Sequence, residues 1–298
     1  MALMSEKKSA DALIRRRDTL GRIETREAQR LSSLSSHLNV MIKAVQKAGR
    51  SIVRDFGEIS QLQVRKKGPG DFVSSADINV ESILIEMLQK ARPDYGFISE
   101  ERGVIAGENK DFTWIIDPID GTTNFVHAIP YFAISVALKH RDEIIAAVLF
   151  NPITNELYYA EKGQGAFLMA PSGNKRLRVS GRGQLADALV GVSGLNSKDK
   201  NQSALSALAG NVAAFRHFGS MSLELVGISA GTLDAVVLKC EKIWDWAAGI
   251  LFVTEAGGKI ATLSGGKKLS DYVSGDFVIA ANVDLWTRIE RLLKKKED

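Results

Sequence analysis

The sequence predicts a mixed α/β architecture in two parts, an α+β domain over residues 37–175 and an α/β domain over residues 176–298. Two early segments repeat apolar residues at three- and four-residue spacing, which indicates amphipathic helices. Short β-rich runs parted by turn residues follow, and these are typical of a meandering antiparallel sheet. Beyond about residue 175, strand-like and helix-like runs alternate, which favours an α/β layer.

In the first part, periodicity predicts one helix at residues 38–57 and a second at 76–92, the latter stopped by Pro93. The basic, glycine-bearing segment between them, VRKKGPGDF at residues 64–72, is interpreted as a polar turn. The predicted strands of the sheet are residues 95–99, 112–117, 131–140, 143–152, 156–161 and 165–170.

In the second part, each predicted strand is followed by a predicted helix or a turn. The strands are residues 188–192, 213–218, 235–239 and 277–281. The helices lie around residues 197–209, 220–231, 244–258 and 284–296.

Composition narrows the class of protein. The chain is 45% hydrophobic and 25% charged, and no apolar run approaches the ~20 residues that a membrane helix needs. The single cysteine, Cys240, fits a reducing compartment, and no secretory signal pattern opens the chain. We therefore expect a soluble, cytoplasmic protein.

Residues 1–36 differ in composition from the rest of the chain. They hold eight Lys/Arg and five Asp/Glu, a net +3 out of the +4 of the whole chain, so residues 37–298 carry only +1. This nearly neutral body gives no support for general nucleic-acid binding. The first 36 residues contain no aromatic side chain and are expected to be a flexible extension. An expression scar, an upstream start site, a frayed helix and a partner-binding arm are all compatible with it.

The stretch WIIDPIDGTTNF, residues 114–125, ends a buried strand on two acidic groups, Asp117 and Asp120. Glu100 ends another predicted strand, and Asp245 begins a strongly apolar helix. Because an isolated buried carboxylate would rather protonate than stay charged, several that converge indicate bound cations. Oxygen ligands without His or Cys nearby favour Mg²⁺.

The residues beside these aspartates suggest a phosphate ester as the substrate. The Ile119 carbonyl is available to coordinate an ion, while Gly121 and Thr122 begin a segment that resembles an anion site. Cations beside an anion site are typical of metal-assisted attack of water on a phosphoryl group, with Thr122 and Glu100 placed to orient the water. Taken alone, this stretch is also compatible with a surface turn or a calcium loop.

Two long segments resemble the signatures of a known family, the inositol monophosphatase superfamily of Mg²⁺-dependent, lithium-sensitive phosphatases. They are WIIDPIDGTTNFVH at residues 114–127 and WDWAAGILFVTEAGG at residues 244–258. The resemblance covers residues 37–290. It implies a layered αβαβα sandwich of the inositol monophosphatase and fructose-1,6-bisphosphatase type, and usually a homodimer.

The resemblance also implies roles for individual residues. The first metal would be held by Glu100, Asp117 and the Ile119 carbonyl, and the second by Asp117, Asp120 and Asp245. Thr122, paired with Asp77, would activate the attacking water, with Glu100 beside it. The residues implied to contact the substrate are Asp120, Gly121, Thr122, Gly219, Ser220, Met221 and Asp245, with the phosphate on the Gly121 and Thr122 amides.

The segment KKGPGDFVSSAD, residues 66–77, resembles the family's mobile loop and implies a third, weaker metal near Lys66 and Asp71. From the residues alone, this segment is only a polar turn before a helix, with Asp77 as a helix cap.

Several positions depart from the family pattern. Ser99 stands where a glycine is usual, a mild change. Leu238, followed by Lys239, occupies the place of a glutamate that binds sugar hydroxyls, and a leucine cannot accept those hydrogen bonds. Met221 is larger than the usual residue there, and Lys239 or Glu241 could face the substrate instead.

These observations favour a Mg²⁺-dependent phosphomonoesterase for a small phosphorylated alcohol, nominally myo-inositol 1-phosphate. Histidinol phosphate, fructose 1,6-bisphosphate and 3′-phosphoadenosine nucleotides are the alternatives within this class. The alternative of another class is a regulatory partner in transcription and ribosomal RNA maturation, as in a bacterial relative. Its support in the sequence is the basic extension of residues 1–36, so contact with nucleic acid or polymerase is only weakly indicated.

Overall fold

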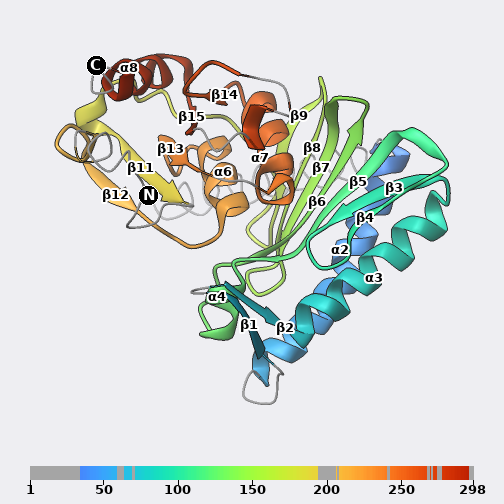
Figure 1. Cartoon of the computed structure of the whole chain (residues 1–298). Coiled ribbons are helices and arrows are strands. Elements are labelled where there is room, and N and C mark those ends of the chain that lie inside the picture. Colours follow the sequence, from blue (N-terminus) through green and yellow to red (C-terminus); the bar gives the residue numbers. More distant parts are fainter. Residues whose placement is uncertain are drawn as a thin grey trace, which may run out of the picture.

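Two β-sheets, with helices between and outside them, make up the described part of the protein (Figure 1). This computed structural model describes residues 34–58, 64–68, 71–193, 206, 208–239, 242–266, 269, 271–273 and 277–294. The order of layers is helices, sheet, helices, sheet, helix, so the αβαβα sandwich expected from the sequence is confirmed. The extension predicted for residues 1–36 falls almost wholly outside the described residues.

Helices α2 (Ser36–Gly57) and α3 (Ser75–Ala91) form the first layer. The Ser35 hydroxyl accepts a hydrogen bond from the Leu38 amide and caps α2, while Ser74 and Asp77 form a capping box at the start of α3. The apolar faces of both helices pack on one face of the larger sheet in a single cluster of buried residues.

The larger sheet has eight strands in the order β10-β9-β8-β7-β6-β5-β3-β4. Their bounds are β3 (Tyr95–Ser99), β4 (Gly103–Ile105), β5 (Asn109–Asp120), β6 (Ala133–His140), β7 (Glu143–Asn151), β8 (Glu156–Glu161), β9 (Gly165–Met169) and β10 (Lys175–Arg176). All of these neighbours pair antiparallel except β3 and β5, which are parallel. Ser99 lies opposite Ile116 in this parallel pair, so Glu100 and Asp117 follow at the same edge of the sheet.

Strand β5 carries a bulge at the end of its run. Asp117 pairs with Ser135 and Asp120 with Ala133, so two residues of β5 stand opposite one residue of β6. The short helix α4 (Thr122–Val126) begins directly after it. The bulge therefore changes the direction of the chain between the two aspartates of the first signature segment.

The smaller sheet has five strands in the order β12-β11-β13-β15-β14. Its elements and the helices around it are β11 (Leu189–Ser193), β12 (Ala214–Arg216), α6 (Met221–Ser229), β13 (Ala235–Leu238), α7 (Ile243–Glu255), β14 (Lys259–Thr262), β15 (Val278–Ala281) and α8 (Val283–Lys294). Strands β12, β11 and β13 run parallel, whereas β15 is antiparallel to both β13 and β14. Two 3-10 turns, Leu185–Asp187 and Asp271–Val273, complete the connections.

Helices α6 and α7 form the middle layer and pack on both sheets. Phe252 of α7 lies in the cluster that faces the larger sheet, and Trp246 of the same helix lies in the cluster that faces the smaller one. Helix α8 covers the outer face of the smaller sheet with Trp286 and its apolar neighbours. The expected boundary between residues 175 and 176 lies within β10, the last strand of the larger sheet, and both sheets share the layer of α6 and α7.

Five strands were missed by the sequence analysis, namely β1, β2, β4, β10 and β14. The segment interpreted as a polar turn forms a hairpin, β1 (Val64–Gly68) and β2 (Asp71–Ser74), beside α4 (Figure 1). Strands β4, β10 and β14 were also not predicted, because runs of three, two and four residues are too short to show a period-2 pattern. Of the helix expected around residues 197–209, only Ser206, Leu208 and Ala209 are among the described residues.

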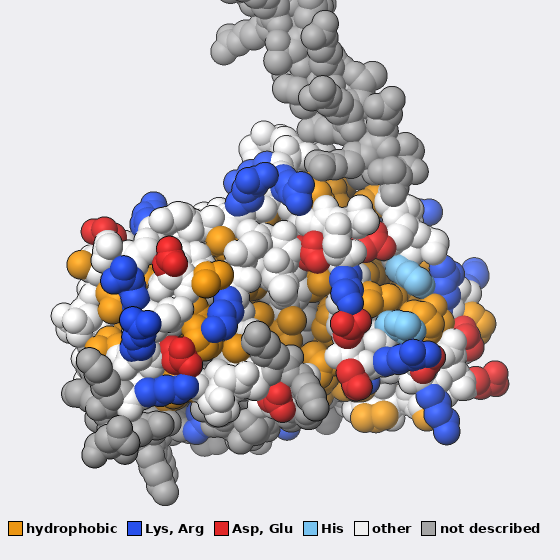
Figure 2. All heavy atoms as spheres, turned by 90° about the horizontal axis from the view of Figure 1, so that it is seen from above, with side chains coloured by type: hydrophobic (Ala, Val, Ile, Leu, Met, Phe, Trp, Pro, Cys, Tyr) orange, Lys and Arg blue, Asp and Glu red, His pale blue; other side chains and the backbone are white. Residues whose placement is uncertain are grey.

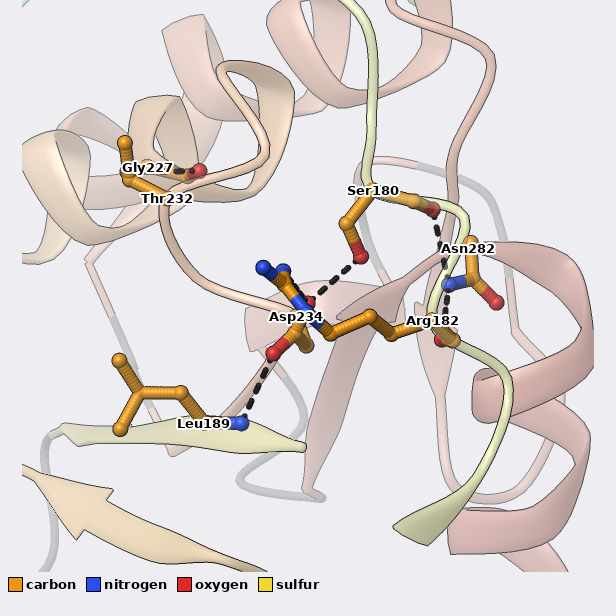
Figure 3. A network of polar contacts seen from close by, with 7 residues as sticks. All are labelled: Ser180, Arg182, Leu189, Gly227, Thr232, Asp234 and Asn282. Atoms are coloured by element: carbon orange, nitrogen blue, oxygen red, sulfur yellow. Dashed lines mark hydrogen bonds and ion pairs between the residues drawn. The ribbon is translucent and has the colours of Figure 1, made fainter. Parts of the chain in front are cut away.

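The link between the two sheets is held by a polar network centred on Asp234 (Figure 3). The buried Asp234 carboxylate accepts hydrogen bonds from the Ser180 hydroxyl at 2.6 Å, the Arg182 guanidinium at 2.9 Å and the Leu189 amide at 2.9 Å. The Asn282 side chain donates to the carbonyls of Ser180 and Arg182 at 3.0 and 2.7 Å. A buried charge with this many donors is well compensated, and it fixes the crossing segment on the smaller sheet.

The surface fits a nearly neutral body. On the face seen in Figure 2, Lys and Arg side chains are interspersed with Asp and Glu. Among the described helices, none is both long and apolar enough to cross a bilayer.

The crossing of α6 and α7 predicts the cost of adding one methyl group. A Cβ on Gly249 would lie 2.7 Å from Leu225 Cβ, so Gly249→Ala should lower the free energy of unfolding by about 1–3 kcal/mol through overpacking. Gly57→Ala is the matched control, because no atom lies within 4 Å of its added Cβ, and it should change stability by no more than about 0.5 kcal/mol. Urea denaturation of both variants measures the difference; equal stabilities would mean that the two helices are not in this close contact.

Candidate functional site

The candidate site is built at the edge of the larger sheet where the parallel strands β3 and β5 end. Asp117 is 2% exposed, and its Oδ1 atom has no hydrogen-bond partner. Burial raises the pKa of Asp117 well above its usual value, and the nearby charges of Glu100, Asp120, Asp245 and Asp77 raise it further, in that order. Four further carboxylates thus act electrostatically on Asp117, a relation that their spacing in the sequence could not establish.

Asp120 is held by the beginning of α6. Its Oδ2 atom accepts hydrogen bonds from the Ser220 hydroxyl at 2.5 Å, from the Ser222 amide at 2.8 Å and from the Ser222 hydroxyl, and its Oδ1 atom accepts from the Met221 amide at 3.2 Å. Burial raises the pKa of Asp120, and these hydrogen bonds oppose that rise. The N-terminal end of a helix also favours a negative charge. Both carboxylate oxygens of Asp120 are thus already engaged within the protein.

Two glycines allow the first signature segment to approach the start of α6. Gly121 has φ +97° and Gly219 has φ +81°, both in the left-handed region that side chains disfavour. A Cβ on Gly121 would lie 3.1 Å from the Gly219 carbonyl oxygen, and one on Gly219 would lie 3.1 Å from the Asn124 side chain. The two predicted substrate-contacting glycines therefore lie side by side and serve a close backbone approach.

The peptide before Gly219 is fixed from two sides. The Asn124 amide group donates to the Phe218 carbonyl at 2.7 Å and to the Tyr131 carbonyl at 2.8 Å. The Phe218 amide donates to the Glu224 carboxylate at 2.9 Å, and the other oxygen of Glu224 accepts from the Ser193 hydroxyl at 2.7 Å. This network joins the first signature segment to the smaller sheet.

Asp77 and Thr122 lie within hydrogen-bonding distance, as the family resemblance implied. Thr122 Oγ1 is 3.2 Å from Asp77 Oδ1 and 3.0 Å from the Ile119 carbonyl oxygen, so its one proton has two possible acceptors. Asp77 Oδ2 also accepts from the Ser74 amide at 2.8 Å and hydroxyl at 2.6 Å, so Asp77 is a helix cap as well. Burial raises the pKa of Asp77 to about 6, while the Ser74 and Thr122 hydrogen bonds lower it.

Asp245 lies in the first turn of α7 and is partly exposed. The other end of this helix is held by Glu255, whose carboxylate accepts hydrogen bonds from the amides of Gly163 and Gly165, both at 2.7 Å. These two amides belong to the turn between β8 and β9. The contact restrains α7 along the larger sheet, and so restrains the distance from Asp245 to the ends of β3 and β5.

The oxygen donors around Asp117 are of the type that a hard divalent ion prefers, although they do not form a complete coordination shell. Among the described residues, no three His, Cys, Asp or Glu side chains already form a group that could hold an ion. The unsatisfied Oδ1 of Asp117 lies among four further carboxylates, a position that a cation would complete. Glu100, Asp117 and Asp245 are better placed for this role than Asp120, because the α6 hydrogen bonds already occupy Asp120.

Two side chains that were expected near the substrate, those of Leu238 and Met221, lie elsewhere in the structure. Leu238 is fully buried in a cluster with Met221 and Trp246 between α6, α7 and the smaller sheet. Its side chain therefore packs in the core and does not line a pocket, and Met221, 9% exposed, packs there too. Lys239 is partly exposed. Glu241 and the side chains of Lys66 and Asp71 lie outside the described residues.

Sequence reasoning missed the side chains that hold the site together. Ser222, Asn124 and Glu224 were not among the predicted site residues. A Gly-Ser-Met-Ser run before an apolar segment is a helix-start signal, which pointed to amides at residues 220–222. Nothing in the spacing indicated that the group bound there would be Asp120, 100 residues earlier.

The chain was compared with known proteins. Residues 33–297 match the model of the inositol monophosphatase family. The inositol-1-monophosphatase of Caulobacter vibrioides is 47% identical over 258 residues, which is 85% of this chain and 99% of that protein. The Nus factor SuhB of Vibrio cholerae is 36% identical, over 82% of this chain and 91% of that protein. The solved extragenic suppressor protein suhB of Bartonella henselae has a TM-score of 0.82 and 42% identity, covering 88% of this chain and all (100%) of that one.

The burial of Leu238 predicts that restoring the usual glutamate is costly. Leu238→Glu should lower the free energy of unfolding by about 2–5 kcal/mol, because it removes core packing and buries a charge. Lys239→Glu, at the neighbouring partly exposed position, is the control and should change it by no more than about 0.5 kcal/mol. Denaturant unfolding gives both values; a Leu238→Glu protein of unchanged stability would show that this side chain faces solvent or substrate.

Proposed function

The chain belongs to the inositol monophosphatase family, and from this premise we propose that it is a Mg²⁺-dependent phosphomonoesterase. Its substrate would be a small phosphorylated alcohol, nominally myo-inositol 1-phosphate. The relative from Caulobacter vibrioides bears the name inositol-1-monophosphatase, which supports this choice.

One observation carries the proposal more than any other, the unsatisfied buried oxygen of Asp117 among neighbouring carboxylates. A structural carboxylate would be expected to have its oxygens bonded, as those of Asp234 are. An acidic oxygen that is buried and unpaired is suited to an ion. We assign Glu100, Asp117 and the Ile119 carbonyl to a first Mg²⁺, and Asp117, Asp120 and Asp245 to a second.

When bound, the ions would supply Lewis acidity that activates water and stabilises the leaving oxygen. The residues of the chain would do the rest. The Thr122 hydroxyl would donate to Asp77 and accept from the water, and so orient the water toward phosphorus. Water attack would break the ester P–O bond and release inorganic phosphate and the alcohol, without a phosphoenzyme.

The substrate would lie between the first signature segment and the start of α6. The amides of Gly121 and Thr122 are assigned to the phosphoryl oxygens. Gly219 and Ser220, with Met221 through its backbone, are assigned to the same face, because Asp120 ties them to Gly121. We also propose that the protein acts as a cytoplasmic homodimer and that lithium inhibits it at the magnesium sites.

The identity of the alcohol is the finer part of the proposal. The family resemblance places a hydroxyl-binding glutamate at position 238, but this chain has there a leucine whose side chain packs in the core, so the position supplies no such contact. Release of phosphate from inositol 1-phosphate, histidinol phosphate, fructose 1,6-bisphosphate and 3′-phosphoadenosine 5′-phosphate, each with Mg²⁺, would rank the candidates. Hydrolysis of none of them by the Mg²⁺-loaded protein would contradict the phosphatase proposal.

A regulatory role is the second candidate, since relatives at 34–36% identity are named Nus factor SuhB. The N-terminal basic extension is its support in this chain. Deletion of residues 2–32 keeps the Ser35 cap of α2 and tests the extension directly. Loss of co-purifying RNA polymerase on deletion would favour this role, and equal recovery by both forms would count against it.

Removal of one proposed ligand should separate chemistry from folding. Asp245→Asn keeps the side-chain volume and removes a charge, so Mg²⁺-dependent phosphate release should fall by about 100-fold or more. Asp284→Asn, an exposed position on α8, is the matched control and should keep wild-type activity. Circular dichroism should show that both variants are folded. Wild-type turnover by Asp245→Asn would remove this residue from the proposed second metal site.

A further inference from the structure

Glu81 is a buried acidic residue to which the proposed reaction gives no role. It lies on α3 one turn after Asp77, and its side chain is 0% exposed. Residues four apart on a helix share a face, so α3 presents both carboxylates toward the edge of the sheet where β3 ends. Burying a carboxylate costs free energy unless the group is hydrogen-bonded or paired with a charge. The contacts of Glu81 therefore indicate which part of the chain it holds in place.

The polar contacts of Glu81 lie at the end of β3 and on the turn that carries Glu100. Its Oε2 atom accepts a hydrogen bond from the Glu101 amide at 2.9 Å. Its Oε1 atom lies 3.5 Å from Arg102 Nε and has no hydrogen-bond partner. Arg102 also donates to the Ser82 hydroxyl at 2.6 Å. The turn is therefore fastened to α3 at two successive residues directly after Glu100.

This turn decides where Glu100 points. It joins β3 to β4, with Ser99 opposite Gly103, and Gly103 has φ +71°. On the other side, the parallel register of Ser99 with Ile116 places Glu100 beside Asp117. Strand pairing positions the backbone up to Ser99 and again from Gly103, whereas Glu100, Glu101 and Arg102 lie in the turn between the two paired residues. The Glu81 carboxylate supplies a restraint at that point.

We propose that Glu81 is a positioning residue, whose carboxylate holds the Glu101 amide so that the neighbouring Glu100 faces Asp117 and both can bind one divalent ion. The inference rests on the proposed function, because it assigns Glu100 and Asp117 to that ion. It adds a fixed element from α3 to a site otherwise built from the two signature segments and the end of β3. Substitution of a residue that orients a metal ligand commonly weakens metal affinity by about 10–100-fold.

Two substitutions separate position from charge. Glu81→Ala removes the acceptor of the Glu101 amide, and Glu81→Gln keeps an acceptor oxygen while it removes the charge. Glu86→Ala is the control, because Glu86 is exposed on the same helix. Mn²⁺ binding to the full chain, followed by electron paramagnetic resonance and calorimetry, gives the dissociation constant without any turnover. The measurement is made at a temperature where circular dichroism shows all variants folded.

We expect the Mn²⁺ dissociation constant to rise at least about 10-fold in Glu81→Ala, by less than about 3-fold in Glu81→Gln, and not at all in Glu86→Ala. The metal concentration for half-maximal phosphate release should shift in the same order.

An unchanged Mn²⁺ dissociation constant in Glu81→Ala, with only the melting temperature lowered, would show a purely structural role and overturn the inference. Equal losses in both Glu81 variants would also overturn it, in favour of a long-range charge effect. A wild-type protein that neither binds Mn²⁺ nor releases phosphate would instead contradict the proposed function itself.

Discussion

The concentration of negative charge around Asp117 is the constraint on which the rest of the site depends. Five carboxylates from four segments, namely α3, the end of β3, β5 and α7, act on one buried edge of a sheet. The protein compensates two of them with its own donors: Asp77 with Ser74 and Thr122, and Asp120 with the start of α6. Asp117 receives no such compensation at Oδ1. The negative charge that the protein's own donors leave uncompensated around Asp117 favours a bound cation. Neutral hydrogen-bond donors at the same place would not offset this charge.

The layers of the sandwich bring the carboxylates together from opposite sides. A single parallel pair in an otherwise antiparallel sheet brings two strand ends to one edge, and a bulge turns the second aspartate toward the middle helices. The middle helices then arrive from the other side, α6 with its amides and α7 with Asp245. Helix α7 is held at its far end by Glu255, which accepts hydrogen bonds from the Gly163 and Gly165 amides.

Much of this was predictable from the sequence, and the limits have physical causes. The acidic strand ends, the cap at Asp77 and most helices follow from local patterns, because periodicity and capping are local properties. Leu238 was expected at a substrate pocket from its place in a motif, yet side-chain direction on β13 depends on register and puts it in the core. The partners of Asp120 and of the Glu101 amide were missed, because long-range hydrogen bonds leave no periodic trace.

The dependence of Asp120 on residues 220–222 has a consequence for synthesis on the ribosome. The strands up to β10 emerge first, with an inner sheet face whose apolar side chains are later covered by α6 and α7. Until residues 220–222 have been translated, Asp120 lacks all four of its donors, and until α7 has been translated that face lacks its cover. The nascent N-terminal half is thus an aggregation-prone intermediate with an exposed apolar sheet face and an Asp120 carboxylate without donors. It reaches the native structure only after the C-terminal half has been synthesised.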